Sequence, residues 1–271
     1  MRRPRPLWQD WKRVSRRLAA APRLALFSDF DGTLAPLVSH PDRARLPART
    51  RAALERLRSL PGVTVGIASG RSRDDLQRRV GLKGVCYLGT HGLERAGRNG
   101  TMNRSVSKSF RRHLRAARGW LQKQLGSLRG IYLEPKSLSV AVHFRHASPR
   151  TAQVARGMVK QLLNGSRNWF RLLEGKKVLE LLPPGREDKG RAVLEAAAGG
   201  AGRAGGSRPM LIYLGDDVTD ESVFQRLRRG DVGIRVGRKG VTAARYRLHS
   251  PQEVARFLSR LGDLRAGEGA K

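Results

Sequence analysis

Leu24-Ala-Leu-Phe-Ser-Asp-Phe-Asp-Gly-Thr-Leu34 is the most informative segment of the chain. Its apolar first part, Leu24 to Phe27, is typical of a buried strand in a parallel sheet. Asp29 and Asp31 follow at once, and they must lie at the strand's end, because burying two carboxylates in an apolar core costs much free energy. Alternate residues of an extended chain point to one side, so both carboxylates face one spot, as ligands of a divalent cation do. The stretch predicts an active site at the carboxyl edge of a sheet.

Further apolar runs repeat this strand pattern. Val63 to Ala68, Val85 to Gly89 and Pro209 to Leu214 are each expected to be buried strands, whereas Ile131 to Arg145 alternates polar and apolar residues like antiparallel strands with one solvated face. We therefore predict an α/β fold, a doubly wound and mostly parallel sheet with an inserted smaller α+β domain. The expected divisions are a helical extension at 1–21, core parts at 22–103 and 184–261, the inserted domain at 104–183, and a flexible tail at 262–271.

The charge of the chain is strongly basic. Its 271 residues hold 55 Lys and Arg against 22 Asp and Glu, a formal net charge of +33. Such a field attracts polyanions, but the excess is dispersed along the chain, so we expect only non-specific association with nucleic acid. No run approaches the ~18 apolar residues of a membrane helix, which predicts a cytoplasmic protein without a membrane partner. We expect a monomer, with its single cysteine, Cys86, in the core.

A second acidic cluster follows the run that ends at Leu214. It contains Asp216, Asp217 and Asp220. Because the ends of parallel strands share one edge, this cluster can meet the aspartates after Phe27. Converging carboxylates repel one another unless a cation joins them, and a set of oxygen ligands without a Cys/His cluster favours Mg²⁺ over zinc. Each cluster taken alone could instead be a helix-capping turn.

Two further sites suit a phosphate. Ser69 and Gly70 lie between a predicted strand end and a helix N-terminus, a place where proteins commonly bind anions. Ser69 could instead be an ordinary N-cap. Lys189 opens a predicted helix next to Gly190. It could bind the phosphoryl group or remain a solvated surface lysine.

These features together resemble a known superfamily. Asp29-Phe-Asp-Gly-Thr-Leu34, Ser69, Lys189 and Gly215-Asp-Asp217 are similar to the four motifs of the haloacid dehalogenase-type phosphatases. Within that superfamily, the trehalose-6-phosphate phosphatases are the family that the chain resembles over roughly residues 24 to 250. That finer resemblance is carried by Ala68-Ser-Gly-Arg71, Thr90-His-Gly-Leu-Glu94, Val142-His-Phe-Arg145, Glu174-Gly-Lys176, Lys189-Gly-Arg-Ala192 and Tyr213-Leu-Gly-Asp-Asp-Val-Thr-Asp-Glu-Ser-Val-Phe224.

The resemblance implies a two-step hydrolysis. Asp29 attacks phosphorus to give an aspartyl-phosphate, while Asp31 protonates the leaving oxygen and later deprotonates water. It implies Mg²⁺ held by Asp29, the backbone carbonyl of Asp31, and Asp216. The remaining implied roles are phosphoryl binding by Ser69, Gly70 and Lys189, and orientation of metal-bound water by Asp217 and Asp220.

The inserted domain is implied to be a cap that closes over a sugar. Sugar hydroxyls call for charged side chains that bind in pairs, although such side chains could equally be ordinary charges on the solvated face of a sheet. Leu182 and Ser137 depart from the residues common in the family, which bears on the sugar accepted. The candidate substrate-binding residues are Arg71, His91, Glu94, Glu134, Lys136, His143, Arg145, Glu174, Lys176 and Glu180.

The sequence therefore favours a Mg²⁺-dependent phosphomonoesterase that hydrolyses trehalose 6-phosphate. Two alternatives stay open. One is a related phosphatase with a different sugar specificity, and the other is a non-enzymatic protein that binds polyanions through its charge.

Overall fold

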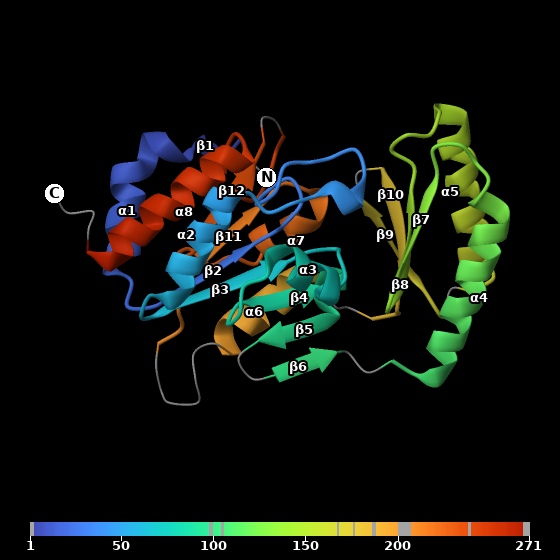
Figure 1. Cartoon of the computed structure of the whole chain (residues 1–271), viewed down its shortest axis with the longest axis horizontal. Helices are drawn as coiled ribbons and strands as arrows, with labels where there is room; N and C mark the ends of the chain where they lie inside the picture. The colour runs from blue at the N-terminus through green and yellow to red at the C-terminus, as the bar shows by residue number, and fades with distance from the viewer. Residues whose placement is uncertain are drawn as a thin grey trace. The chain divides into compact units, whose positions relative to one another are not determined.

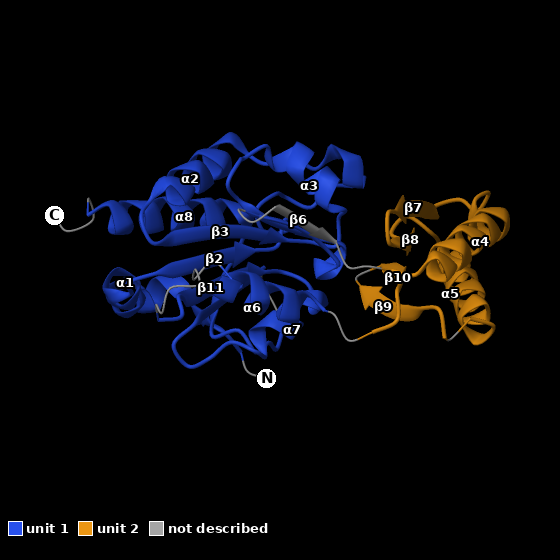
Figure 2. Cartoon of the chain, turned by 90° about the horizontal axis from the view of Figure 1, so that it is seen from below, with its two compact units in different colours: residues 1–102, 187–271 blue, residues 103–186 orange. Residues whose placement is uncertain are grey.

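The computed structural model describes two compact units (Figure 2). The core unit is Met1–Met102 with Glu187–Lys271, and the inserted unit is Asn103–Arg186. Within the described residues, no helix combines the length and the apolar character that a membrane span requires. The described residues are 3–97, 100–103, 106–166, 168–175, 177–185, 188–199, 207–237 and 240–267.

A nine-stranded sheet forms the centre of the core unit (Figure 1). Its strands pair in parallel from β1 to β4, and β5 turns back antiparallel to β4. The parallel part agrees with the predicted doubly wound sheet. In spatial order the strands are β1 (Arg5–Pro6), β13 (Tyr246–Leu248), β12 (Val232–Val236), β11 (Met210–Gly215), β2 (Leu24–Ser28), β3 (Val63–Ala68), β4 (Cys86–Gly89), β5 (Glu94–Gly97) and β6 (Gly100–Asn103).

Helices cover both faces of this sheet because its central strands are apolar on both sides. In β2, Leu24 and Leu26 pack into one cluster, while Ala25 and Phe27 pack into another on the opposite face. The first cluster includes residues of α1 (Trp11–Ala20), α2 (Ala48–Ser59), α3 (Arg73–Val80) and α8 (Pro251–Ala266), and the second includes residues of α6 (Lys189–Gly199) and α7 (Glu221–Phe224). Short 3-10 turns complete the unit: η1 (Leu7–Asp10), η2 (Pro41–Arg43), η3 (Thr90–Gly92) and η4 (Val218–Asp220).

Two predictions at the ends of the chain need correction. The N-terminal segment contains the expected helix α1, but it also adds β1 to the edge of the sheet, which the helical pattern did not indicate. The flexible tail predicted from residue 262 is wrong at its start, because α8 continues to Ala266. Gly262 is buried and Leu264 packs against the core, so burial extends the helix past the glycine. Residues 268–271 lie outside the described residues.

The inserted unit is an antiparallel sheet with helices on one face. Its four strands are ordered β7 (Tyr132–Lys136), β8 (Ser139–His143), β10 (Val178–Leu182) and β9 (Arg171–Gly175), and its helices are α4 (Lys108–Leu125) and α5 (Pro149–Asn164). Val140, Val142, Leu179 and Leu181 face the helices in one apolar cluster. Because side chains alternate along a strand, Glu180 and its neighbours on β7 and β8 belong to the opposite face, which we call the polar face.

Candidate active site

The candidate active site of the core unit begins at the carboxyl ends of two paired strands. Leu214 of β11 lies beside Ser28 of β2, and the backbone N–H of Asp29 donates to Leu214 O over 2.8 Å. This register brings Asp29 and Asp216 to the same point of the edge. Carboxylate oxygens of Asp29, Asp216 and Asp220 all lie within 4.8 Å of one another. The two predicted acidic clusters therefore meet.

A glycine turn allows this close approach. Gly32 has a φ of +80°, and a Cβ built on it would lie 2.4 Å from Asp216 Oδ2. Any side chain here would therefore be strained and would displace the carboxylate. Thr33 follows and donates its hydroxyl to Asp216 Oδ1 over 3.2 Å.

Lys189 lies inside the acidic cluster and not on the surface. Its ammonium group donates to Asp29 Oδ1 over 2.9 Å and to Asp220 Oδ1 over 2.8 Å, and the residue is 3% exposed. The alternative of a solvated surface lysine is therefore wrong. The buried Tyr213 also donates its hydroxyl to Asp220 Oδ1, over 2.7 Å. This bond was not predictable from the sequence, because Tyr213 lies within an apolar strand.

The electrostatics of the cluster show an excess of negative charge. Burial raises the pKa of Asp29, and the neighbouring aspartates raise it further against the opposing effect of Lys189. Burial, followed by Asp220 and Asp217, raises the pKa of Asp216 to about 7. Asp29, Asp216 and Asp220 each offer a carboxylate oxygen as a metal ligand. The cluster could therefore hold a divalent metal ion.

Asp220 accepts more hydrogen bonds than the other aspartates of the cluster. Besides Lys189 and Tyr213 on Oδ1, its Oδ2 accepts the backbone N–H of Asp217 over 2.9 Å. Asp217 and Asp220 form a reciprocal capping box around η4. The capping turn that the sequence left open is therefore real for this pair, and it coexists with the bond to Lys189.

Ser69 and Gly70 follow β3 directly, which is the position expected for the predicted phosphate-binding site. Ser69 is 2% exposed, and its hydroxyl accepts the backbone N–H of Arg71 over 3.2 Å. The cap of the following helix is a different residue, because Ser72 Oγ accepts the N–H of Asp75. Ser69 is therefore not the N-cap of α3.

His91 and Glu94 are buried close to this turn. His91 has a φ of +56°, in the left-handed region, and a Cβ on Gly70 would lie 2.9 Å from its ring. Such backbone strain is common at functional sites. Glu94 accepts the backbone N–H of Arg73 over 2.7 Å, which gives it a capping contact at the start of α3.

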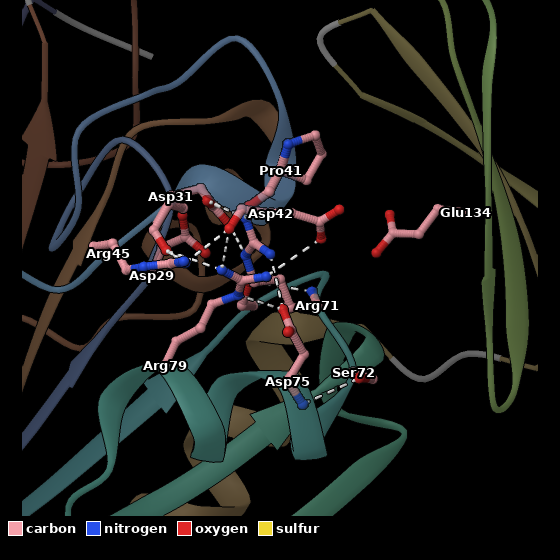
Figure 3. A network of polar contacts seen from close by, with 12 residues as sticks. Asp29, Asp31, Pro41, Asp42, Arg45, Arg71, Ser72, Asp75, Arg79 and Glu134 are labelled. Carbon is pink, nitrogen blue, oxygen red and sulfur yellow. Dashed lines mark hydrogen bonds and ion pairs between the residues drawn. The ribbon is translucent and has the colours of Figure 1, made fainter.

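Arg71 forms an ion pair with Asp31 (Figure 3). Its Nε donates to Asp31 Oδ2 over 2.6 Å, and its Nη2 donates to Asp31 Oδ1 over 2.8 Å. Its Nη1 donates to Asp75 Oδ2 over 2.8 Å, and Nη2 also reaches the carbonyl of Pro41 over 2.8 Å. The sequence did not indicate this contact with Asp75.

A second polar cluster lies on the polar face of the inserted unit. Lys136 Nζ donates to Glu180 Oε1 over 3.1 Å and lies 3.5 Å from Glu134 Oε2. Ser139 donates its hydroxyl to Glu180 Oε1 over 2.5 Å. His143 Nε2 lies 2.9 Å from Glu134 Oε2, and this hydrogen bond, with Lys136, lowers the pKa of Glu134 although burial opposes the shift.

Three candidate substrate-binding residues of the inserted unit do not belong to this cluster. Glu174 pairs across the hairpin with Leu179, so it lies on the helix side of the sheet, where it forms an ion pair with Arg156 at 3.2 Å. Arg145 is exposed in the turn after β8. Lys176 lies outside the described residues.

Comparison with known proteins shows the family of the chain. The sequence model of the family described as trehalose-phosphatase matches residues 27–252. The chain is 37% identical over 258 residues to the trehalose-phosphate phosphatase of Mycobacterium avium, covering 90% of this chain and 64% of that protein. The chain thus spans less than two-thirds of the length of such curated relatives, 57% to 64%.

Solved structures share the fold. The C-terminal domain of C. albicans trehalose-6-phosphate phosphatase matches with a TM-score of 0.79 at 22% identity, covering 96% of this chain and 98% of that one. A haloacid dehalogenase-like hydrolase from Bacteroides thetaiotaomicron matches with a TM-score of 0.64 at 16% identity, covering 88% of this chain and 99% of that one. By the family match over most of its length, the chain belongs to the trehalose-phosphatase family, and it has the haloacid dehalogenase-like fold.

Proposed function

We propose that this chain is a Mg²⁺-dependent phosphomonoesterase that converts trehalose 6-phosphate to trehalose and phosphate. The observation that carries the proposal is the buried Asp29–Lys189–Asp220 chain with Asp216 beside it, at the carboxyl edge of a parallel sheet. Ligands of open α/β sheets bind at this edge. The family of the chain supplies the substrate class.

Asp29 is the proposed nucleophile. A carboxylate oxygen of Asp29 forms a bond to phosphorus while the bond from phosphorus to the sugar oxygen breaks, which leaves an aspartyl-phosphate. Lys189 holds Asp29 Oδ1 and so fixes the direction of the carboxylate. Ser69 and Gly70, at the end of β3, together with Lys189, are proposed to bind the phosphoryl oxygens.

Asp31 is the proposed proton donor and acceptor. It gives a proton to the departing sugar oxygen, and then takes one from the water that attacks the aspartyl-phosphate, so that the proton count balances over the two steps. Asp31 lies two residues after Asp29, and its side chain is 31% exposed, which leaves it accessible to both groups.

The metal site is proposed to consist of Asp29, Asp216 and the backbone carbonyl of Asp31, with Asp217 and Asp220 orienting metal-bound water. When bound, Mg²⁺ would neutralise charge on the phosphoryl group. The excess negative charge of the cluster, seen in the raised pKa of Asp216, supports this assignment.

Sugar recognition is proposed to depend on the polar face of the inserted unit. Ion pairs and hydrogen bonds join Glu134, Lys136, His143 and Glu180 there, and Lys136 and Glu180 are buried. Paired carboxylates and an ammonium group suit the hydroxyls of a disaccharide. We further propose a cytoplasmic monomer that associates with nucleic acid only through its charge.

A substrate panel tests the proposal. With Mg²⁺ present, phosphate release should be fastest by kcat/KM from trehalose 6-phosphate, and slower from sucrose 6-phosphate and glucose 6-phosphate. Preference for another sugar phosphate would support the alternative specificity and reject our interpretation of the polar face. No release from any sugar phosphate would reject the phosphatase assignment.

A further inference from the structure

Arg71 is buried and its donors are committed to protein groups. The residue is 7% exposed, and its guanidinium donates four hydrogen bonds, to both oxygens of Asp31, to Asp75 and to the carbonyl of Pro41. Binding a substrate phosphate would require it to break this paired arrangement. The arrangement therefore favours a role toward Asp31 over a role as a substrate ligand.

Arg71 and Asp31 form a bidentate ion pair. Nε and Nη2 meet the two carboxylate oxygens at 2.6 and 2.8 Å, which fixes the plane of the carboxylate as well as its position. Such fixation has value for a proton-transferring group, because a displacement of about 1 Å can cost on the order of 100-fold in rate. Without Arg71 the partly exposed Asp31 side chain could rotate toward solvent.

Arg71 is in turn anchored from two elements. Asp75, one turn along the chain in α3, holds Nη1, and it is itself held by Arg79 Nε over 2.7 Å. Pro41, at the start of η2, holds Nη2 through its carbonyl, and Arg79 bonds Ala44 just after η2, over 2.9 Å. Hydrogen bonds from Arg79 and Arg71 lower the pKa of Asp75 although burial opposes them, so Asp75 stays ionised.

We infer that Arg71 is a positioning residue for Asp31, and that Asp75 acts on the reaction only through Arg71. The inference rests on the proposed function, in which Asp31 transfers the proton. It replaces the expectation that Arg71 binds substrate. Asp75 touches neither Asp31 nor the acidic cluster in any contact of the described residues, so its effect must pass through the guanidinium.

The test compares Arg71→Met, Asp75→Asn and the double variant on trehalose 6-phosphate with Mg²⁺. Arg71→Met should lower kcat by about 10- to 100-fold, a part of the 10²–10⁴ that proton transfer supplies. KM and the inhibition constant of inorganic phosphate should change by less than about threefold, since phosphoryl binding does not use Arg71. The kcat of Arg71→Lys should lie between those of Arg71→Met and the wild type, because one ammonium group cannot form both hydrogen bonds of the bidentate pair.

Asp75→Asn should lower kcat by about 3- to 10-fold, and the double variant should be no slower than Arg71→Met, because coupled residues do not act additively. Arg73→Met and Asp74→Asn are matched controls from the same helix, which form an ion pair with each other; both should keep kcat within about twofold. Circular dichroism of each variant verifies folding. If Arg71→Met does not fold, the kcat of Asp75→Asn compared with that of its control Asp74→Asn still tests the inference.

Three results would overturn the inference. A raised KM and phosphate inhibition constant with unchanged kcat would make Arg71 a substrate ligand. Multiplying effects in the double variant would give Asp75 an independent role. Wild-type kinetics in both single variants would remove the role altogether. A wild-type protein that releases no phosphate would instead reject the proposed function.

Discussion

Both units of the molecule contain a buried lysine between two carboxylates, but the surroundings differ. In the core unit, Lys189 lies between Asp29 and Asp220. In the inserted unit, Lys136 lies between Glu134 and Glu180. The carboxylates of the core unit follow the ends of parallel strands, whereas those of the inserted unit lie in the middle of the antiparallel strands β7 and β10.

The difference lies in the balance of charge. Around Lys189 the carboxylates outnumber the cations, and the pKa of Asp216 rises to about 7 through burial and like charge. Around Lys136, His143 donates to Glu134 and helps to lower the pKa of that carboxyl. The core cluster has three carboxylates to one ammonium group and gains from a bound cation, while the inserted cluster has two carboxylates to one ammonium group, and each of the two is also hydrogen-bonded to His143 or Ser139.

The largest expected effect is on the proposed nucleophile of the core unit. Asp29→Asn should reduce phosphate release by at least ~10³-fold, because the amide cannot attack phosphorus. The fold should persist, since the substitution keeps the shape of the side chain. Steady-state rates and circular dichroism check both statements. Turnover near the wild-type rate would contradict the mechanism.

Mg²⁺ should change the unfolding free energies of Lys189→Met and Lys136→Met differently. Removing one partner of a buried pair leaves an uncompensated charge and costs about 3–5 kcal/mol of unfolding free energy. We expect this loss for both Lys189→Met and Lys136→Met, measured by urea unfolding. Added Mg²⁺ should recover part of it only for Lys189→Met, because a ligand that binds the folded state stabilises it.

Lys12→Met is the control for these two variants. Lys12 is exposed on α1, so its loss should change the unfolding free energy by no more than about 0.5 kcal/mol. Equal recovery of both buried variants by Mg²⁺ would contradict the contrast between the clusters.

The smallest expected effect is the pH response of Glu134. Its pKa lies below the ordinary value of 4.5, so the folded chain binds fewer protons there than the unfolded chain. The stabilisation is present above pH 4.5 and is lost as the pH falls through the lowered pKa. Glu134→Gln does not titrate, so its unfolding free energy should fall less on acidification.

Urea unfolding at a series of acidic pH values measures this response. Glu174→Gln is the control, because Glu174 lies on the helix side of the sheet in an exposed pair with Arg156. Identical pH profiles for wild type and Glu134→Gln would show that His143 and Lys136 do not favour the charged form.

The apolar runs of the sequence were sufficient to predict the buried strands. β2, β3, β4 and β11 are found within one residue of the predicted positions. Strands β1 and β5 were missed because they are short, lie toward the edges of the sheet and carry charged residues such as Glu94 and Arg95, so they show no continuous apolar run.

The candidate site was partly predictable. The meeting of Asp29 with Asp216 follows from the rule that parallel strands end at one edge, and Lys189 followed from the family motif. The pairing of Arg71 with Asp31 was not predictable, because nothing in their spacing says which carboxylate a guanidinium will meet. The face to which Glu174 belongs was not predictable, because a shift of one residue in the register of β9 moves each of its side chains to the other face.

The most direct test of the account is the metal dependence of the wild-type rate. Phosphate release from trehalose 6-phosphate should be measured with Mg²⁺, after EDTA, and after Mg²⁺ is restored in excess. We expect loss of activity with EDTA and full recovery with Mg²⁺, since the carboxylates around Asp29 outnumber the neighbouring cations. An equal rate in EDTA would contradict the central claim that this acidic cluster works with a divalent cation.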